Sequence, residues 1–277
     1  MKIGVIGAGV MGAGIAQAFA MNEEYRVVVC DITAELAANG KHKIKTNLEK
    51  LVQKGKMEQA TYESALSRVE TGLVEQVGDC DLVIEATIEK MELKKAVFAQ
   101  LQTVCKKDCI FATNTSSLSI TELSRGLDRP VVGMHFFNPA PVMKLVEVIA
   151  GLFTPESLCD QVSEIARSIG KTPVRVQEAA GFVVNRILIT MINEAIGVYA
   201  DGVASAEEID TAMKLGANHP MGPLELGDLV GLDVCLAIRE TLESETGDPK
   251  YRPHPLLKKM VRANWLGRKT KKGFFEY

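Results

Sequence analysis

The sequence predicts an α/β protein: a Rossmann-type, doubly wound, mostly parallel sheet with an inserted helical hairpin, followed by a smaller all-α domain. Three observations support this prediction. A glycine-rich turn joins the first apolar run to a helix-forming run. Apolar strands then alternate with helical stretches as far as residue 177, and from Gly181 onward the apolar residues recur only at helical spacing. We therefore expect two domains, residues 1–180 and 181–277.

The glycine-rich turn follows the apolar run of residues 3–6 and precedes the helix-forming run of residues 15–20. In a dinucleotide-binding turn, the first glycine permits a tight bend, the second lets the backbone approach a pyrophosphate, and the third lets the helix lie close to the strand. A second apolar run ends at Asp31, where this fold places the carboxylate that binds the adenine ribose. The spacing predicts NAD as the cofactor, bound by Gly7, Gly9, Val10, Met11, Gly12 and Asp31.

The next segment, residues 34–68, is helical in pattern and is interrupted near Lys54-Gly55-Lys56. It is far longer than an ordinary crossover between parallel strands, so we expect an inserted helical hairpin. The hairpin is rich in lysine, which fits either a solvated face or a surface that meets an anionic substrate tail.

The remaining strands of the sheet are predicted from short apolar runs at residues 80–86, 109–113, 131–135, 144–149 and 172–177. Thr154 is expected to cap a helix that ends at residue 169. In the second domain, Ser205 and Glu208 predict a capping box. A helix over residues 89–105 is predicted from one apolar stripe, formed by Leu93, Val97, Leu101 and Val104.

The composition argues against several classes of function. A net charge of −3 and a pI near 5.9 give no basic field, so nucleic acid is a poor partner. The longest apolar stretch, residues 181–200, carries polar and charged side chains, which favours a buried helix over a membrane span. No histidine pair has the spacing of a metal site, so no metal is expected. Six cysteines without a C-x-x-C pair indicate free thiols and a cytoplasmic location.

His135 ends a predicted strand, and Glu147 lies on the apolar side of the next one. A carboxylate on an apolar face is unfavourable without a partner. If the loop of residues 136–142 lets the two strands approach, Glu147 can accept a hydrogen bond from one imidazole nitrogen, and the other nitrogen can then take a proton. The pair therefore predicts a general base. Ser116, Asn114 and Asn185 are polar residues near strand or helix ends, where ordinary capping explains each as well as function does.

Several segments together resemble the L-3-hydroxyacyl-CoA dehydrogenases: Gly7–Gly12, Asn114–Ser117, His135–Met143, Gly181–Arg186 and Asp210–Gly216. The resemblance covers the whole chain and is closest to the short bacterial members, the 3-hydroxybutyryl-CoA dehydrogenases. It implies an NAD-dependent enzyme that interconverts 3-hydroxyacyl-CoA and 3-ketoacyl-CoA. It also implies a homodimer, or a dimer of dimers, that pairs through the helical domain.

The resemblance also implies roles for individual residues. His135 becomes the catalytic base with Glu147 as its partner, while Ser116 and Asn185 contact the substrate oxygen. Ser117 remains the alternative to Ser116. The implied NAD contacts outside the glycine turn are Asp31, Glu89, Lys94, Ser116, Asn138 and Lys269. The implied contacts to the coenzyme A portion of the acyl-CoA substrate are Asn47 and Lys54.

Two other functions stay open at this point. A related dehydrogenase of a free hydroxy acid, such as L-gulonate, would use the same base but would have no purpose for Asn47 and Lys54. A non-catalytic nucleotide-binding protein could share the fold, because fold does not determine function. The intact pair of His135 and Glu147 argues against that second alternative.

Overall fold

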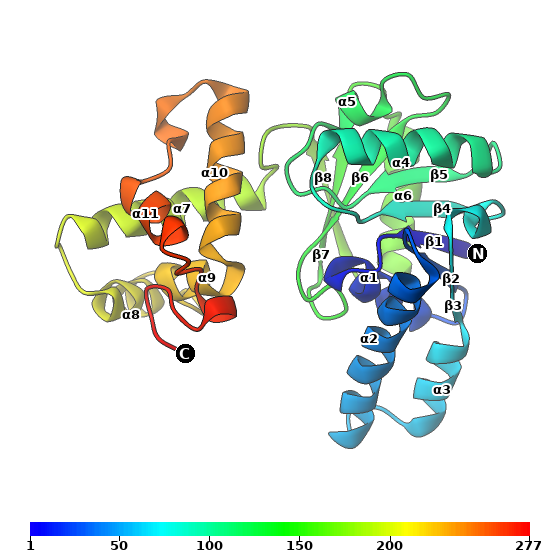
Figure 1. The fold of residues 1–277 in the computed structure, drawn as a ribbon, viewed down its shortest axis with the longest axis horizontal. Coiled ribbons are helices and arrows are strands. Elements are labelled where there is room, and N and C mark those ends of the chain that lie inside the picture. Colours follow the sequence, from blue (N-terminus) through cyan, green and yellow to red (C-terminus); the bar gives the residue numbers. More distant parts are fainter. The chain divides into compact units, whose positions relative to one another are not determined.

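A computed structural model describes all 277 residues as two compact units, Met1–Glu178 and Ala179–Tyr277 (Figure 1). The first unit contains one eight-stranded sheet with helices, and the second is built from helices. The predicted fold class is therefore confirmed. No helix is both long and apolar enough to cross a membrane.

The first unit begins with the strand–turn–helix that the glycine pattern predicts, and the predicted hairpin follows as two helices that lie side by side (Figure 1). The elements up to the hairpin are β1 (Lys2–Ile6), α1 (Val10–Ala20), β2 (Arg26–Cys30), α2 (Ala34–Gln53) and α3 (Gln59–Ser67). The rest of the unit comprises β3 (Val69–Gly72), β4 (Leu82–Glu85), α4 (Met91–Val104), β5 (Ile110–Thr113), α5 (Ile120–Ser124), β6 (Val131–Phe136), β7 (Leu145–Ala150), α6 (Glu156–Ser168) and β8 (Thr172–Gln177).

The strands are ordered β3-β2-β1-β4-β5-β6-β7-β8, and every neighbouring pair is parallel except β6 and β7. The connection between those two strands, residues 137–144, is too short for the crossover that a parallel pair needs, so the chain reverses direction. In the antiparallel register, His135 lies directly opposite Glu147.

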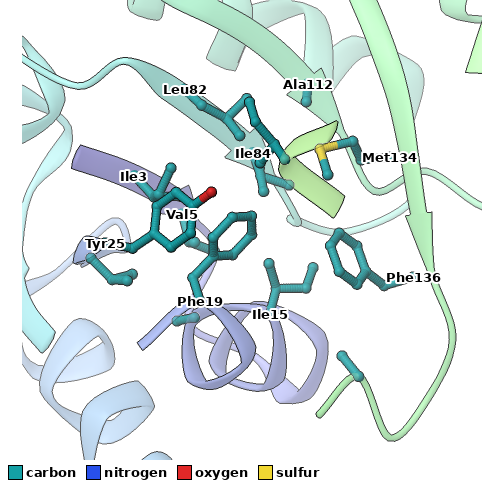
Figure 2. Close-up of a cluster of buried hydrophobic side chains, with 14 of the residues drawn as sticks. Ile3, Val5, Ile15, Phe19, Tyr25, Leu82, Ile84, Ala112, Met134 and Phe136 are labelled. Carbon is teal, nitrogen blue, oxygen red and sulfur yellow. The ribbon is translucent and has the colours of Figure 1, made fainter. Parts of the chain in front are cut away.

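One face of the sheet packs on α1. Figure 2 shows Ile15 and Phe19 of this helix against Ile3 and Val5 of β1, together with apolar side chains of β4 and β6. Because side chains alternate between the two faces of a strand, the apolar neighbours of His135 and Glu147 in sequence point to this core. His135 and Glu147 themselves therefore lie on the opposite face.

The second unit contains five α-helices, and its polar side chains fix several of their ends. Ser205 and Glu208 form the predicted capping box at the start of α8. Asp210 accepts hydrogen bonds from the backbone N–H groups of Leu224 at 2.9 Å and Glu225 at 2.8 Å, which joins α8 to the first turn of α9. The helices are α7 (Val184–Ala200), α8 (Ala206–Gly216), α9 (Pro223–Val230), α10 (Leu232–Thr246) and α11 (Pro255–Arg262).

One local prediction is partly wrong and another is wrong. Of the stripe assigned to α4, Leu101 is buried as expected, but Leu93 is 46% exposed, and Lys94 and Phe98, which lie outside the predicted stripe, are buried. The helix is rotated to bring the Lys94 ammonium group inward, where it finds an acidic partner. Thr154 does not cap α6, because the N-cap residue of this helix is Pro155, which makes no side-chain bond. The Thr154 hydroxyl instead donates to the carbonyl of Val131 at 2.8 Å.

Candidate active site

The turn between β1 and α1 needs glycine for steric reasons at two of its three glycine positions. Gly7 has a φ of +102°, and a Cβ atom added there would lie 2.6 Å from the carbonyl oxygen of Ala86. At Gly12, an added Cβ would lie only 1.7 Å from the carbonyl oxygen of Gly7. Gly9, in contrast, faces open space and caps α1 without any side-chain bond. The helix N-terminus therefore has both room and N–H donors for an anionic pyrophosphate.

Asp31 lies at the end of β2 beside this turn. Its carboxylate accepts hydrogen bonds from the backbone N–H groups of Ala8 at 2.7 Å and Ile32 at 2.8 Å. These bonds hold a partly exposed carboxylate next to the glycine turn, where ribose hydroxyls can donate to it. The steric need for glycine, the open helix N-terminus and this acid together fit NAD.

His135 and Glu147 form a buried pair at the end of β6. Their side chains approach to 2.7 Å between Nδ1 and Oε2, and only 5% of His135 and 1% of Glu147 is exposed. This contact confirms that Glu147 bonds one imidazole nitrogen. With Nδ1–H donating to the carboxylate, a neutral imidazole uses Nε2 as its proton acceptor. The ring of Phe137 lies beside the imidazole, with 4.4 Å between the ring centroids.

Asn114, which follows β5, contributes to the position of this histidine. Its Oδ1 accepts a hydrogen bond from the backbone N–H of Phe136 at 2.9 Å. The bond joins the loop after β5 to the end of β6, one residue from His135. Asn114 therefore ties together the ends of two neighbouring strands.

Glu89 gathers the polar residues of the same loop. Its Oε1 accepts from the Thr115 hydroxyl at 2.5 Å, from the Ser116 and Ser117 hydroxyls at 3.2 Å each, and from both serine N–H groups at 2.7 and 3.1 Å. Burial alone would raise the pKa of Glu89, but the Lys94 charge and the bonds from Thr115 and Ser116 outweigh it and lower the pKa. Glu89 is therefore a charged acceptor at neutral pH. Because both hydroxyls bond it equally, the structure does not separate Ser116 from Ser117.

Beneath Glu89 lies a buried ion pair that includes Glu85, a residue that the sequence prediction missed. The Lys94 ammonium group lies 2.8 Å from both Glu85 oxygens and 3.3 Å from Glu89, and Lys94 is only 1% exposed. Glu85 also accepts from the Thr113 hydroxyl at 2.7 Å and from the N–H of Thr87 at 2.6 Å. The signal in the sequence was an acid that ends an apolar strand, as Asp31 does.

The other predicted contacts lie on separate elements. Asn47 is exposed on α2, with its Nδ2 3.4 Å from Gln17 of α1, and Lys54 is exposed at the C-terminal end of α2. Asn138 is exposed in the loop between β6 and β7. Asn185 and Lys269 belong to the second unit, where Asn185 lies in the first turn of α7 and Lys269 is ion-paired with Asp233.

Comparison with known families identifies both units. Residues 2–179 match the NAD binding domain of 3-hydroxyacyl-CoA dehydrogenase, and residues 181–277 match the C-terminal domain of the same enzyme. The chain belongs to the 3-hydroxyacyl-CoA dehydrogenase family. The resemblance predicted from the sequence motifs and the NAD cofactor are thereby confirmed.

Individual relatives of this dehydrogenase agree over nearly their whole lengths. A 3-hydroxybutyryl-CoA dehydrogenase of Clostridioides difficile is 58% identical over 280 residues, covering 100% of this chain and 99% of the relative. The human mitochondrial hydroxyacyl-coenzyme A dehydrogenase is 41% identical, covering 99% and 90%. The crystal structure of (S)-3-hydroxybutyryl-CoA dehydrogenase from Ralstonia eutropha superimposes with a TM-score of 0.95 at 45% identity, covering 100% and 98%.

Proposed function

We propose that this dehydrogenase interconverts (S)-3-hydroxyacyl-CoA and 3-ketoacyl-CoA with NAD, and that 3-hydroxybutyryl-CoA and acetoacetyl-CoA are its principal pair of substrates. The 2.7 Å contact between His135 and Glu147 is the observation that carries the proposal. A buried imidazole with a carboxylate partner, in a dinucleotide-binding unit, is suited to moving the proton of a hydroxyl group. The acyl chain is inferred from the names of the bacterial relatives.

In the oxidative direction, Nε2 of His135 removes the proton from the 3-hydroxyl group, so the imidazole must be neutral at the start. The glycine turn and Asp31 would hold NAD, whose chemistry here would be to supply an acceptor for the hydride at C3 of the substrate. Glu147 stabilises the imidazolium that forms, because its carboxylate bonds Nδ1–H. In the reductive direction, the same imidazolium returns the proton to the oxygen of the 3-ketoacyl group.

The remaining site residues have supporting roles in this proposal. Ser116, with Ser117 as the alternative, and Asn185 hold the substrate oxygen. Glu89 orients the serine hydroxyls, and the buried Lys94 acts on the cofactor through Glu89 rather than by its own contact. Outside this cluster, Asp31, Asn138 and Lys269 bind NAD, and Asn47 and Lys54 bind the coenzyme A portion.

The proposal is tested by mixing the protein with NADH and acetoacetyl-CoA and following the loss of NADH absorbance. We expect turnover that declines as the ketoacyl chain is lengthened and that is absent with the keto form of L-gulonate. Turnover of the free acid alone would favour the related hydroxy-acid dehydrogenase. Binding of NADH without turnover of any ketoacyl-CoA would favour the non-catalytic alternative.

We also propose a homodimer, or a dimer of dimers, formed by the second unit. This unit exposes large apolar side chains, including Ile187 of α7 at 67%, Val203 between α7 and α8 at 72%, and Leu215 of α8 at 82%, which is typical of a subunit contact. Sedimentation at micromolar concentration tests this, and a species of 30.1 kDa would contradict it. A cytoplasmic location is supported by the six cysteines, all of which are buried free thiols.

A further inference from the structure

Lys171, between α6 and β8, is a buried cation that the reaction as described does not use. It is 7% exposed, and its ammonium group donates to the backbone carbonyls of Ala140 at 2.6 Å and Met143 at 2.8 Å. It makes no ion pair with a carboxylate. Burial, and to a lesser extent the charge of Lys144, lower its pKa. A buried charge is unfavourable unless it is paired or hydrogen-bonded, and the partners of this ammonium group are the two carbonyls.

Both carbonyls belong to the loop of residues 137–144, which leaves β6 just after His135 and enters β7 just before Glu147. The loop also carries Asn138. Lys171 reaches it from the start of β8, so one side chain fastens the loop to a third strand of the sheet.

Two further contacts fasten the same loop from other directions. On the α1 side, a Cβ atom added at Gly14 would lie 3.2 Å from both Ala140 Cβ and Pro141 Cδ, so the loop rests closely on that helix. On the β8 side, the N–H of Thr172 donates to the carbonyl of Lys144 at 2.7 Å. The loop therefore has a defined position that depends on its neighbours, and the Lys171 ammonium group provides two of the bonds.

We propose that Lys171 is a positioning residue that sets the affinity for NAD by holding the loop of residues 137–144, and with it Asn138, in the binding conformation. This inference rests on the proposed role of Asn138. Cofactor binding does not have to supply the free energy of ordering a loop that is already ordered. The bonds from Lys171 therefore lower the dissociation constant for NAD. The pairing of β6 with β7 has its own backbone hydrogen bonds, so the contact between His135 and Glu147 does not depend on Lys171.

The test compares NADH dissociation constants, measured by fluorescence titration, for Lys171→Met and for the matched control Lys144→Met. Methionine keeps the length of the side chain but removes both donated bonds, and we expect the dissociation constant to rise by at least about tenfold, since bonds from a charged donor are among the stronger ones. Lys144→Met removes an exposed lysine at the end of the same loop, whose side chain donates neither of these bonds, and should change the NADH dissociation constant by less than about twofold. Lys171→Arg, which keeps the donors, should restore much of the lost affinity.

AMP binding separates positioning from general damage to the unit. AMP carries the adenine ribose that Asp31 is proposed to bind, and the bonds that position Asp31 go to Ala8 and Ile32 and not to the loop of residues 137–144. We expect Lys171→Met to bind AMP as the parent does. If this variant does not fold, Lys171→Gln takes its place, because its shorter side chain cannot reach both carbonyls.

An unchanged NADH dissociation constant in Lys171→Met would overturn the inference. A parallel loss of AMP affinity would also overturn it, since that pattern means that Lys171 only stabilises the fold. A parent protein that binds no NADH would instead refute the proposed function, and the two failures are therefore distinguishable.

Discussion

Replacing Glu147 by Gln tests whether its carboxylate acts through the imidazole of His135. Glutamine has nearly the same volume and keeps a carbonyl oxygen that can accept the Nδ1–H bond. What it removes is the negative charge, which in the parent lies 2.7 Å from Nδ1 and is 1% exposed. The substitution therefore isolates the electrostatic contribution of the pair from its packing.

The size of the effect follows from this geometry. An imidazolium and a carboxylate with charge centres about 4 Å apart attract each other by about 4 kcal/mol at an effective dielectric constant of about 20. That attraction exists only while the imidazole is protonated, so in the oxidative direction it is gained during the reaction and not when the substrate binds. Because about 1.4 kcal/mol is tenfold in rate, we expect turnover to fall by about 10² to 10³, with little change in NADH affinity.

Steady-state oxidation of 3-hydroxybutyryl-CoA by NAD, the direction in which the imidazolium forms, measures the loss of turnover. The measurement is made in a cycle with His135→Gln, whose turnover should fall by about 10² to 10⁴. In the double variant there is no imidazolium to stabilise, so we expect it to be no slower than His135→Gln. Glu178→Gln is the matched control, because it removes a carboxylate of the same unit that bonds Thr121 instead. Losses that multiply in the double variant would refute the reasoning.

Three further predictions follow from the cofactor side of the site. Asp31→Ala should narrow the preference for NADH over NADPH by about tenfold, because the lost carboxylate both accepts from the ribose and repels a 2′-phosphate; better binding of NADPH by the parent would contradict this assignment. Gly12→Ala places a methyl group 1.7 Å from the Gly7 oxygen, so the melting temperature should fall and NADH binding should weaken by more than about tenfold, and normal NADH titration would be inconsistent with the close packing. The lowered pKa of Glu89 means that the folded state binds fewer protons than the unfolded state, so the free energy of unfolding decreases as the pH falls below about 4.3. In Glu89→Gln, the free energy of unfolding, measured by denaturant titration at several pH values, should decrease less steeply with falling pH. The same pH dependence in parent and variant would count against the charged state of Glu89.

The parts of the fold that were predictable have strong local patterns. The glycine turn has a fixed spacing and a steric cause, visible now at Gly7 and Gly12. The contact between His135 and Glu147 was predictable because a lone acid on an apolar strand needs a partner. Its catalytic role and those of the other site residues stay predictions until the variants are measured.

The structural features that were not predicted depend on contacts between residues that lie far apart in the sequence. β3 has one buried residue, Val69, and is a strand only because β2 lies beside it. On α4, apolar spacing favoured Leu93 as a core residue, whereas the buried residue is Lys94, whose charge is neutralised by Glu85 from a strand earlier in the chain. Lys171 has the same character, since its acceptors lie about thirty residues away in the loop before β7. A charged residue with a remote partner has no signature in its own segment.

The antiparallel register of β6 and β7 constrains how the length of this protein can vary in evolution. A single inserted or deleted residue within β7 would exchange its two faces, sending Glu147 into the core under α1 and placing Val146 or Val148 opposite the imidazole. In contrast, residues 54–58, which connect α2 to α3 at the tip of the helical hairpin, have no alternation of buried and exposed side chains to preserve, and they are largely exposed. The helical hairpin can therefore be lengthened or shortened without changing which side chains face the core, whereas the spacing around β6 and β7 is fixed in steps of two.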